Sequence, residues 1–267
     1  MDIILIILLL AALLGFPAIV HYVKKQRTIV QGPLPASYRL LLNEKVEFYK
    51  RLDPVKKTEF ENRMQVFLAN VKITGVRTTV ENTDKVLIAA GAIIPIFGFP
   101  DWEYINLNEV LLYPDYFGEG FNQEGKGRDI LGMVGSGAYQ NVMILSKNHL
   151  RSGFEDDNSK GNTAIHEFVH LIDKTDGAVD GVPEFLLSDQ LALPWLNNIR
   201  ESIKQIRENR SDINPYGATN EAEFFAVVAE YFFKRPDLLE SKHHELYEIL
   251  VSIFKQKPNS NPQTENS

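Results

Sequence analysis

Two histidines four residues apart constrain this chain more than any other feature. His166 and His170 enclose the segment Glu167-Phe168-Val169. Four residues of an α-helix advance about 6 Å and turn about 400°, so both imidazoles project from one helix face. Apolar residues surround the motif, which predicts that its helix is buried in the core. Two buried imidazoles without partners would cost stability.

The motif has the H-E-x-x-H pattern that is typical of zinc-binding helices. Imidazole nitrogens bind zinc at about 2.0–2.1 Å, so His166 and His170 can share one ion. Glu167 projects beside them and can take a proton from a metal-bound water during attack on a carbonyl. Asn162 or Thr163 is expected to cap the helix just before the motif. The alternative, a helix with two surface histidines, conflicts with the apolar surroundings.

A catalytic zinc site usually has three protein ligands and one open position, which leaves one ligand to find. Asp176 lies ten residues after the first histidine, where some metalloproteases have their third ligand, although the glycine at which those chains turn is missing. Glu223 and Glu230 lie seven residues apart in an apolar segment, 220–233, that is expected to be helical, so they share a face. Buried carboxylates need a cation or hydrogen-bond donors, and a salt bridge to Lys or Arg would also satisfy them. The residues alone leave these alternatives open.

Composition excludes several other classes of protein. The chain has 267 residues, 44% of them hydrophobic and 24% charged, which is ordinary for a folded protein. Zero cysteines exclude disulfide scaffolds, cysteine nucleophiles, iron–sulfur clusters and peptide deformylase, which combines H-E-x-x-H with a cysteine ligand. Residues 24–57 hold nine Lys/Arg against three acids, while residues 58–267 hold 19 against 31. Because residues 58–267 have this excess of acidic side chains, we predict that the protein does not bind nucleic acid, which requires a basic face.

The N-terminus contains an uncharged stretch of 18 residues, 3–20, rich in Ile and Leu. As a helix it nearly matches the roughly 30 Å hydrocarbon core of a bilayer. A cleaved signal peptide has positive charge before its apolar part and small residues after it. Here Asp2 precedes the stretch and Lys24 and Lys25 follow it, which favours a retained transmembrane anchor over residues 1–23. Positive flanks stay cytoplasmic, so we expect a single-pass protein of the inner membrane with its folded domain facing the cytoplasm.

The rest of the chain divides into a short linker, one folded domain and a tail. Two prolines and a glycine indicate a juxtamembrane linker over 24–36, which the domain follows over 37–257. Residues 258–267 are rich in Asn, Pro, Gln and Ser and are expected to be disordered.

Local patterns within the domain predict mainly helices. They are expected over 37–71, with a second start at Asp53-Pro54, and over 195–210, 220–233 and 243–255. Short strands are expected over 109–114 and 141–146. The apolar segment 88–100 is too short to span a membrane and is predicted to be buried core. Three glycines at 132, 135 and 137 indicate a flexible loop, and because no Gly-Lys-Ser/Thr ending follows, it is not a phosphate loop.

Three blocks of sequence resemble the Mlc titration factor A family of bacterial zinc-dependent peptidases, whose catalytic core resembles that of anthrax lethal factor. They are His166-Glu-Phe-Val-His-Leu-Ile-Asp173, Asp176-Gly-Ala-Val-Asp-Gly-Val-Pro183, and the run from Tyr216-Gly-Ala-Thr-Asn220 through Glu223 to Phe233. Asp101-Trp102 and Val110-Leu-Leu-Tyr-Pro114 extend the resemblance, which covers roughly residues 40–255.

The resemblance implies a fold and a set of site residues. The fold is α+β: a mostly helical, zincin-like metallopeptidase domain with a small β-sheet, preceded here by one transmembrane helix. In the family, Zn²⁺ is held by the two histidines and by a glutamate seven residues after a characteristic tyrosine. The matching pair in this chain is Tyr216 and Glu223. Tyr216 would stabilise the oxyanion or the leaving group; alternatively, it is a turn residue after Asn214-Pro215.

The function implied is that of a membrane-anchored zinc metallopeptidase of the gluzincin type, acting on a peptide or protein substrate with Glu167 as general base. The alternative is a protein that sequesters a transcriptional repressor of the Mlc type and hydrolyses peptides incidentally. Sequestration would not require Glu167, so the complete set of ligands and base favours the enzyme. The best-known family member is soluble, and the anchor is a departure from it. Asp173, Asp176 and Asp180 lack the spacing of a calcium loop and are expected to be surface turn residues. The alternative is that one of them orients a ligating histidine.

Overall fold

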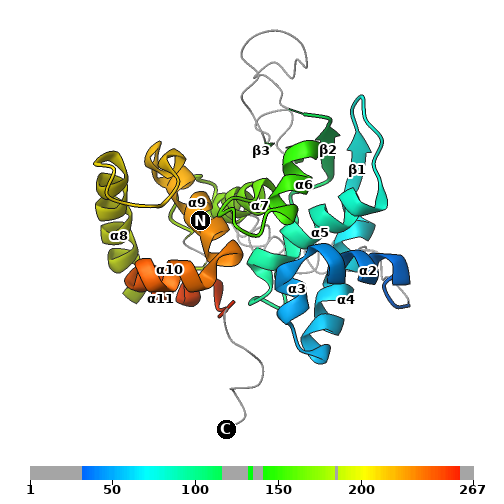
Figure 1. Cartoon of the computed structure of the whole chain (residues 1–267), viewed down its shortest axis with the longest axis horizontal. Coiled ribbons are helices and arrows are strands. Elements are labelled where there is room, and N and C mark those ends of the chain that lie inside the picture. Colours follow the sequence, from blue (N-terminus) through cyan, green and yellow to red (C-terminus); the bar gives the residue numbers. More distant parts are fainter. Residues whose placement is uncertain (1–31, 116–131, 135–140, 184–185, 259–267) are drawn as a thin grey trace, which may run out of the picture. The chain divides into compact units, whose positions relative to one another are not determined.

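The computed structural model describes residues 32–115, 132–134, 141–183 and 186–258. Helices predominate and are accompanied by one small sheet, which agrees with the α+β class expected (Figure 1). In chain order the elements are α2 (Ala36–Lys45), α3 (Glu47–Arg51), α4 (Pro54–Asn70), β1 (Lys72–Gly75), α5 (Asn82–Ile96), β2 (Glu109–Tyr113), β3 (Gly132–Val134), β4 (Val142–Ser146), α6 (Lys147–Glu155), α7 (Thr163–Asp173), η2 (Lys174–Asp176), α8 (Asp189–Arg207), η3 (Pro215–Ala218), α9 (Glu221–Lys234), α10 (Pro236–Lys242) and α11 (His244–Phe254).

The sheet has four strands in the order β1-β2-β4-β3. The first three are parallel, with Val110 opposite Ile73 and Met143. Strand β3 runs antiparallel to β4 at the edge, with Gly132 opposite Leu145. The sequence predicted β2 and β4 but not the two edge strands. The prediction of a flexible loop was wrong at Gly132, because pairing with β4 makes residues 132–134 a strand, and three residues are too few to carry an alternation signal. Gly135 and Gly137 lie outside the described residues.

Most predicted helices are present, with shifted ends. Asp53 caps α4 as expected, since its Oδ1 accepts from the backbone N–H groups of Val55 and Lys56 at 2.8 and 2.9 Å. Helix α8 begins at Asp189, ahead of the predicted start, and contains Pro194. Helix α6 was not predicted.

Helix α5 is the buried segment that the sequence placed at 88–100. It begins earlier, at Asn82, and every residue from Val86 to Ile96 is buried. Gly91 lets α5 approach α7 closely, because a Cβ at that position would lie 2.6 Å from the Cβ of Ala164. The close packing of α7 against α5 therefore depends on a glycine at position 91.

Helix α7 runs through the middle of the described domain, between α5 and α9 (Figure 1). Strand β3 also contacts it, so the helix has neighbours from both halves of the chain. The segment that carries the histidine motif is thus enclosed by the core, as its apolar residues predicted.

Among the helices that the structure describes, none is both long enough and apolar enough to cross a bilayer. The anchor predicted over residues 1–23 lies outside the described residues, as do most of the linker over 24–36 and nearly all of the tail over 258–267.

Candidate metal centre

Helix α7 presents both histidines from one face. Asn162 caps the helix, with its Oδ1 accepting from the backbone N–H of Ile165 at 3.1 Å. Phe168 and Val169 are fully buried on the core side of the helix. His166 is 9% exposed, so the motif is buried and is not a helix with two surface histidines.

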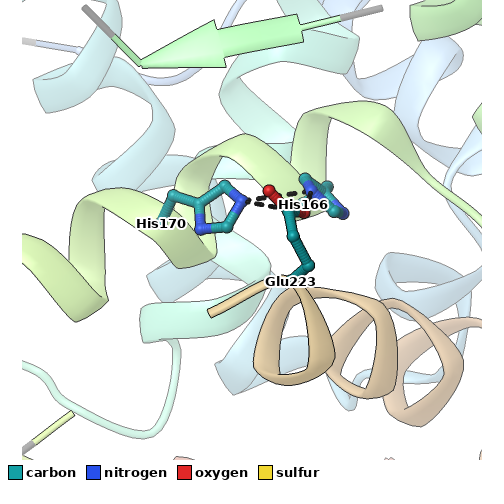
Figure 2. Close-up of side chains that lie close together, drawn as sticks. All are labelled: His166, His170 and Glu223. Atoms are coloured by element: carbon teal, nitrogen blue, oxygen red, sulfur yellow. Dashed lines mark hydrogen bonds and ion pairs between the residues drawn. The ribbon is translucent and has the colours of Figure 1, made fainter. Parts of the chain in front are cut away.

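Helix α9 brings a carboxylate to these imidazoles. Asn220 caps it by accepting from the backbone N–H of Glu223 at 2.8 Å, which fixes Glu223 in the first turn. Figure 2 shows the Glu223 side chain pointing from α9 toward both histidines. The sequence-predicted ligands His166, His170 and Glu223 therefore meet in space.

The spacing of the three donor atoms suits a zinc ion. Nε2 of His166 lies 3.1 Å from Nε2 of His170 and 3.0 Å from Oε2 of Glu223, and the remaining distance is 3.5 Å. Ligand atoms at 2.0–2.1 Å from a tetrahedral zinc lie about 3.3 Å from each other, so the donors already have the spacing that the ion requires. Two nitrogens and one carboxylate oxygen are also ligands that zinc prefers.

Glu230, the second candidate carboxylate on α9, does not join this set. Glu230 contacts the opposite side of the His166 ring, where its Oε1 lies 2.7 Å from Nδ1. Among the described residues its ion-pair partner is His166, and no Lys or Arg takes that place. The side chain of Asp176 lies outside the described residues.

The titratable side chains of the site lie close together and shift one another's pKa values. Burial lowers the pKa of His166, but the carboxylates of Glu230 and Glu223 outweigh it and hold that pKa well above its ordinary value. Burial raises the pKa of Glu223, but hydrogen bonds from His166 and His170 outweigh it and lower that pKa to about 2. A proton and a metal ion compete for Nε2 of His166, so metal binding there depends on pH.

Glu167 is the buried carboxylate beside the two imidazoles. It is 5% exposed. Burial raises its pKa, although His166 and His170 act in the opposite direction. A carboxylate with a raised pKa is a better proton acceptor than one in water, as a general base requires.

Gly132 makes room for this carboxylate, a role that the sequence did not indicate. A Cβ at Gly132 would lie 2.6 Å from both Cγ and Oε1 of Glu167. The glycine at the start of β3 thus lets the edge strand approach the motif. Only the fold connects the two residues, because they lie 35 positions apart in the sequence.

Tyr216 lies in η3 beside the same site. Its ring centroid is 6.0 Å from that of His166, and the side chain is 52% exposed. Burial of the hydroxyl group, followed by the charges of Glu223 and Glu167, raises its pKa, so the phenol keeps its proton. It is thus a hydrogen-bond donor next to the histidines, and Glu223 is its partner in the metal-free chain.

A cleft of about 560 Å³ opens onto these residues. Its lining includes His166, Glu167, Tyr216 and Glu230, and small residues of α6 and the following loop such as Gly153. The candidate ligand His166, the candidate base Glu167 and Tyr216 are therefore accessible to a molecule bound in this cleft.

Asp173 differs from its predicted role, whereas Asp180 agrees with it. Asp173 is fully buried and is not a surface residue, since its Oδ2 accepts from the backbone N–H of Gly181 at 2.8 Å. After α7 the chain turns back and packs Gly181, at φ 77°, against the start of α9. Asp180 is exposed, as expected of a turn residue.

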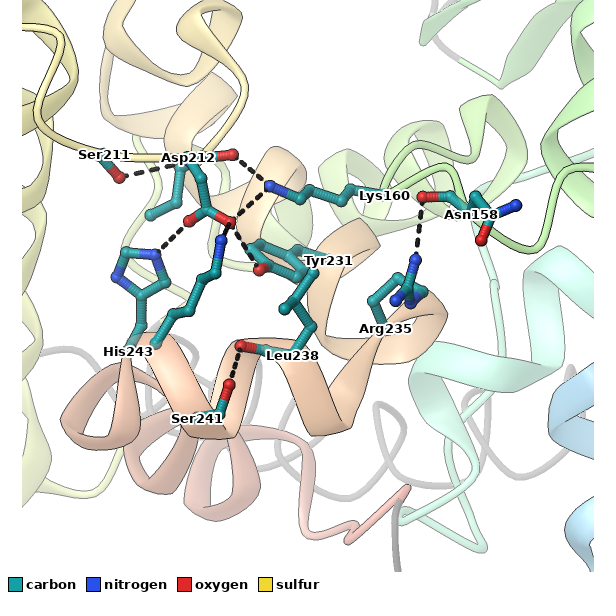
Figure 3. Close-up of polar contacts among 11 residues, drawn as sticks. Asn158, Lys160, Ser211, Asp212, Tyr231, Arg235, Leu238, Ser241 and His243 are labelled. Carbon is teal, nitrogen blue, oxygen red and sulfur yellow. Dashed lines mark hydrogen bonds and ion pairs between the residues drawn. The ribbon is translucent and has the colours of Figure 1, made fainter.

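A second polar cluster, around Asp212, joins the elements that carry the site (Figure 3). The Asp212 carboxylate accepts from Lys160 at 2.7 Å, from Lys242 at 2.9 Å, from His243 at 2.7 Å and from the Tyr231 hydroxyl at 3.0 Å. Lys160 precedes α7, Tyr231 lies on α9, and Asp212 itself precedes the segment that carries Tyr216. One carboxylate therefore fixes three elements of the site.

Replacing Asp212 with asparagine is expected to destabilise the protein by about 1–3 kcal/mol at pH 7, the usual cost of losing hydrogen bonds to a charged group. Burial raises the pKa of Asp212, but its hydrogen bonds from Lys160, His243 and Lys242 outweigh it and hold that pKa well below its ordinary value of 3.8. A lowered pKa contributes stability that is present above about pH 4 and is lost as pH falls toward the folded-state pKa. Urea unfolding at a series of pH values should therefore show a shallower acid loss in Asp212→Asn.

The exposed carboxylate of Asp157 provides the matched control, since it has no hydrogen-bond partner among the described residues. Asp157→Asn should leave both the stability at pH 7 and its dependence on pH nearly unchanged. Equal effects of the two substitutions would contradict the role given to Asp212.

The site combines a buried H-E-x-x-H helix with a converging carboxylate from a second helix, which are the residue types that a metallopeptidase uses. Comparison with known proteins agrees. Residues 20–255 match the family model described as glucose-regulated metallo-peptidase M90, so the chain belongs to this metallopeptidase family. The resemblance noted from the sequence is thereby confirmed at the level of the family.

Individual relatives match to different extents. The uncharacterized protein slr2042 of Synechocystis sp. is 30% identical over 263 residues, which cover 94% of both chains. Mlc titration factor A of Serratia proteamaculans is 32% identical over 167 residues, covering 57% of this chain and 61% of that protein. Mlc titration factor A of an Escherichia coli strain is 30% identical over 165 residues, covering 57% and 60%. The similarity to the titration factors thus covers less than two thirds of this chain and less than two thirds of each titration factor.

Proposed function

We propose that this protein is a zinc-dependent peptidase that hydrolyses peptide bonds with His166, His170 and Glu223 as metal ligands and Glu167 as general base. The observation that carries the proposal is the convergence of three donor atoms at 3.0, 3.1 and 3.5 Å beside a buried carboxylate. Membership of a metallopeptidase family supports it.

Each residue has a part that follows from its environment. When bound, zinc supplies a Lewis acid that polarises the scissile carbonyl group. Glu167 accepts a proton from the attacking water and returns it to the leaving amine. Tyr216 keeps its proton and donates a hydrogen bond to the carbonyl oxygen as negative charge develops there.

The proposal is tested on the full-length chain purified in detergent. Its zinc content is measured, and hydrolysis of a mixed peptide library is followed before and after treatment with a zinc chelator. About one zinc per chain, with hydrolysis that stops on chelation and returns when zinc is added back, is the expected result. A metal-free chain that neither takes up zinc nor hydrolyses any peptide in its presence would contradict the proposal.

Replacing Tyr216 with phenylalanine removes only a hydroxyl group. Zinc content and thermal stability should persist, while kcat falls about 10²–10³-fold, the usual loss for one oxyanion donor. Steady-state kinetics on the peptide that the wild type cleaves best provide the measurement. Unchanged turnover would return Tyr216 to the role of a turn residue after Asn214-Pro215.

A second candidate function is the binding of a transcriptional repressor, which the name of the matched relatives, Mlc titration factor A, suggests. Co-purification with an Mlc-type repressor distinguishes the two. If repressor binding is the main activity, Glu167→Gln should retain it while losing hydrolysis. If the chain is chiefly a peptidase, no stable complex is expected with either form.

We also propose that residues 1–23 anchor the protein in the inner membrane, with the catalytic domain in the cytoplasm. The proposal rests on the 18 uncharged residues at 3–20 and on the positive charges that follow them. A reporter fused after Ser267 tests it. Activity of a cytoplasmic reporter supports the proposal, whereas alkaline-phosphatase activity, or a mature N-terminus near His21, would overturn it.

A further inference from the structure

Glu230 is a buried carboxylate that the peptidase mechanism above does not use. It lies on α9, two turns beyond Glu223, and is 9% exposed. Its Oε1 lies 2.7 Å from Nδ1 of His166, and its Oε2 accepts a short hydrogen bond from the backbone N–H of Asn162. One carboxylate oxygen therefore has its partner within α7, and the other has its partner at the residue that caps α7.

The contact with His166 decides which ring nitrogen faces the metal position. A carboxylate only accepts hydrogen bonds, so Nδ1 of His166 must carry the proton. With Nδ1 protonated, Nε2 is the ring nitrogen that can exchange its proton for a metal ion, and it faces Glu223 and His170 at 3.0 and 3.1 Å. We propose that Glu230 is a positioning residue, which fixes the tautomer and orientation of His166 for metal binding. The proposal rests on the zinc site proposed above.

The two histidines are not equivalent in this respect. Nδ1 of His170 is buried and has no hydrogen-bond partner among the residues that the structure describes. A hydrogen bond to the outer nitrogen of a ligating histidine orients the ring and raises its basicity. Among the described residues, only His166 of the two histidines has a hydrogen-bond partner at its Nδ1, and that partner is Glu230.

The second oxygen of Glu230 links the two helices that carry the ligands. Asn162 caps α7, and its side-chain amide donates to the carbonyl of Gly153 at 3.1 Å. By binding the backbone of Asn162, Glu230 joins the start of α7 to α9, the helix of Glu223. The backbone of Gly161 packs closely beside this contact, since a Cβ on Gly161 would lie 3.3 Å from Oε2 of Glu230.

The first measurement is zinc affinity, determined for the full-length chain in detergent by competition with a chromophoric chelator at pH 7. Glu230→Gln keeps the size of the side chain but removes its charge, and should weaken zinc binding about 10–100-fold, the usual effect of losing such a partner. Glu221→Gln is the matched control, because Glu221 is an exposed acid on the same helix, and its affinity should stay within about twofold of wild type.

The second measurement separates positioning from general stability. In chains with ¹⁵N-labelled histidine, wild-type His166 bound to zinc should show metal-bound Nε2 and a slowly exchanging Nδ1–H, and Glu230→Gln should lose the slow exchange. Thermal unfolding of the metal-free variants checks that they fold. If Glu230→Gln does not fold, Glu230→Asp replaces it, and should weaken zinc binding by a smaller factor because it keeps the charge.

The outcomes separate this proposal from the proposed function. A wild type that binds zinc, together with a folded Glu230 variant of unchanged affinity and unchanged Nδ1–H exchange, overturns the positioning role and leaves the peptidase proposal intact. Zinc bound through Nδ1 of His166 also overturns the positioning role. A wild type that does not bind zinc overturns the proposed function itself, and the positioning role with it.

Discussion

Replacing Glu167 with glutamine is expected to abolish peptide hydrolysis while leaving the metal site intact. The amide keeps the size of the side chain but cannot accept a proton from the attacking water, so the loss of kcat should equal or exceed the 10²–10⁴-fold contribution typical of general base catalysis. Zinc content should match wild type, because Glu167 is not among the three converging donors. Kinetics and metal analysis on the same preparation provide the measurement.

Two outcomes would contradict this role for Glu167. Hydrolysis that persists at a comparable rate would remove it from proton transfer. Loss of zinc in a folded Glu167→Gln chain would instead make it part of the metal site. Glu221→Gln, an exposed change of the same kind, should leave both properties unchanged.

Replacing Glu223 with alanine is expected to remove the bound metal and, with it, all hydrolysis. The substitution deletes the only carboxylate oxygen of the converging set among the described residues and leaves two nitrogens 3.1 Å apart. Zinc content after desalting should fall to background, whereas Glu221→Ala, two residues earlier on α9, should retain one zinc per chain.

Comparison with Glu230→Ala tests the assignment of the third ligand. If Glu230 is a positioning residue, Glu230→Ala should weaken zinc binding. It should not reduce the zinc content to background when zinc is in excess. A metal-free Glu230→Ala chain beside a zinc-loaded Glu223→Ala chain would exchange the roles of the two carboxylates.

The sequence by itself determined the elements whose signals are local. The buried helix of His166 and His170 follows from the apolar residues around a motif with helical spacing. The start of α4 follows from Asp53 and Pro54, because capping involves only neighbouring residues. These predictions need no knowledge of what lies elsewhere in the chain.

The third ligand was determined only in part. Glu223 and Glu230 lie on one helix face, and the residues alone left both open; the resemblance to a family selected Glu223. The structure separates them because α9 crosses α7 so that Glu223 reaches the Nε2 side of the His166 ring and Glu230 the Nδ1 side. The crossing of two helices is set by packing, which no spacing within one helix encodes.

Only the tertiary structure decided the remaining features, which depend on residues far apart in the chain. Strand β3 exists through its pairing with β4, and it brings Gly132 against Glu167. The Asp212 carboxylate meets Lys160, 52 residues earlier, and His243, 31 residues later. Such contacts form only when the core has packed, because the chain carries no local signal for a partner that folding alone brings near.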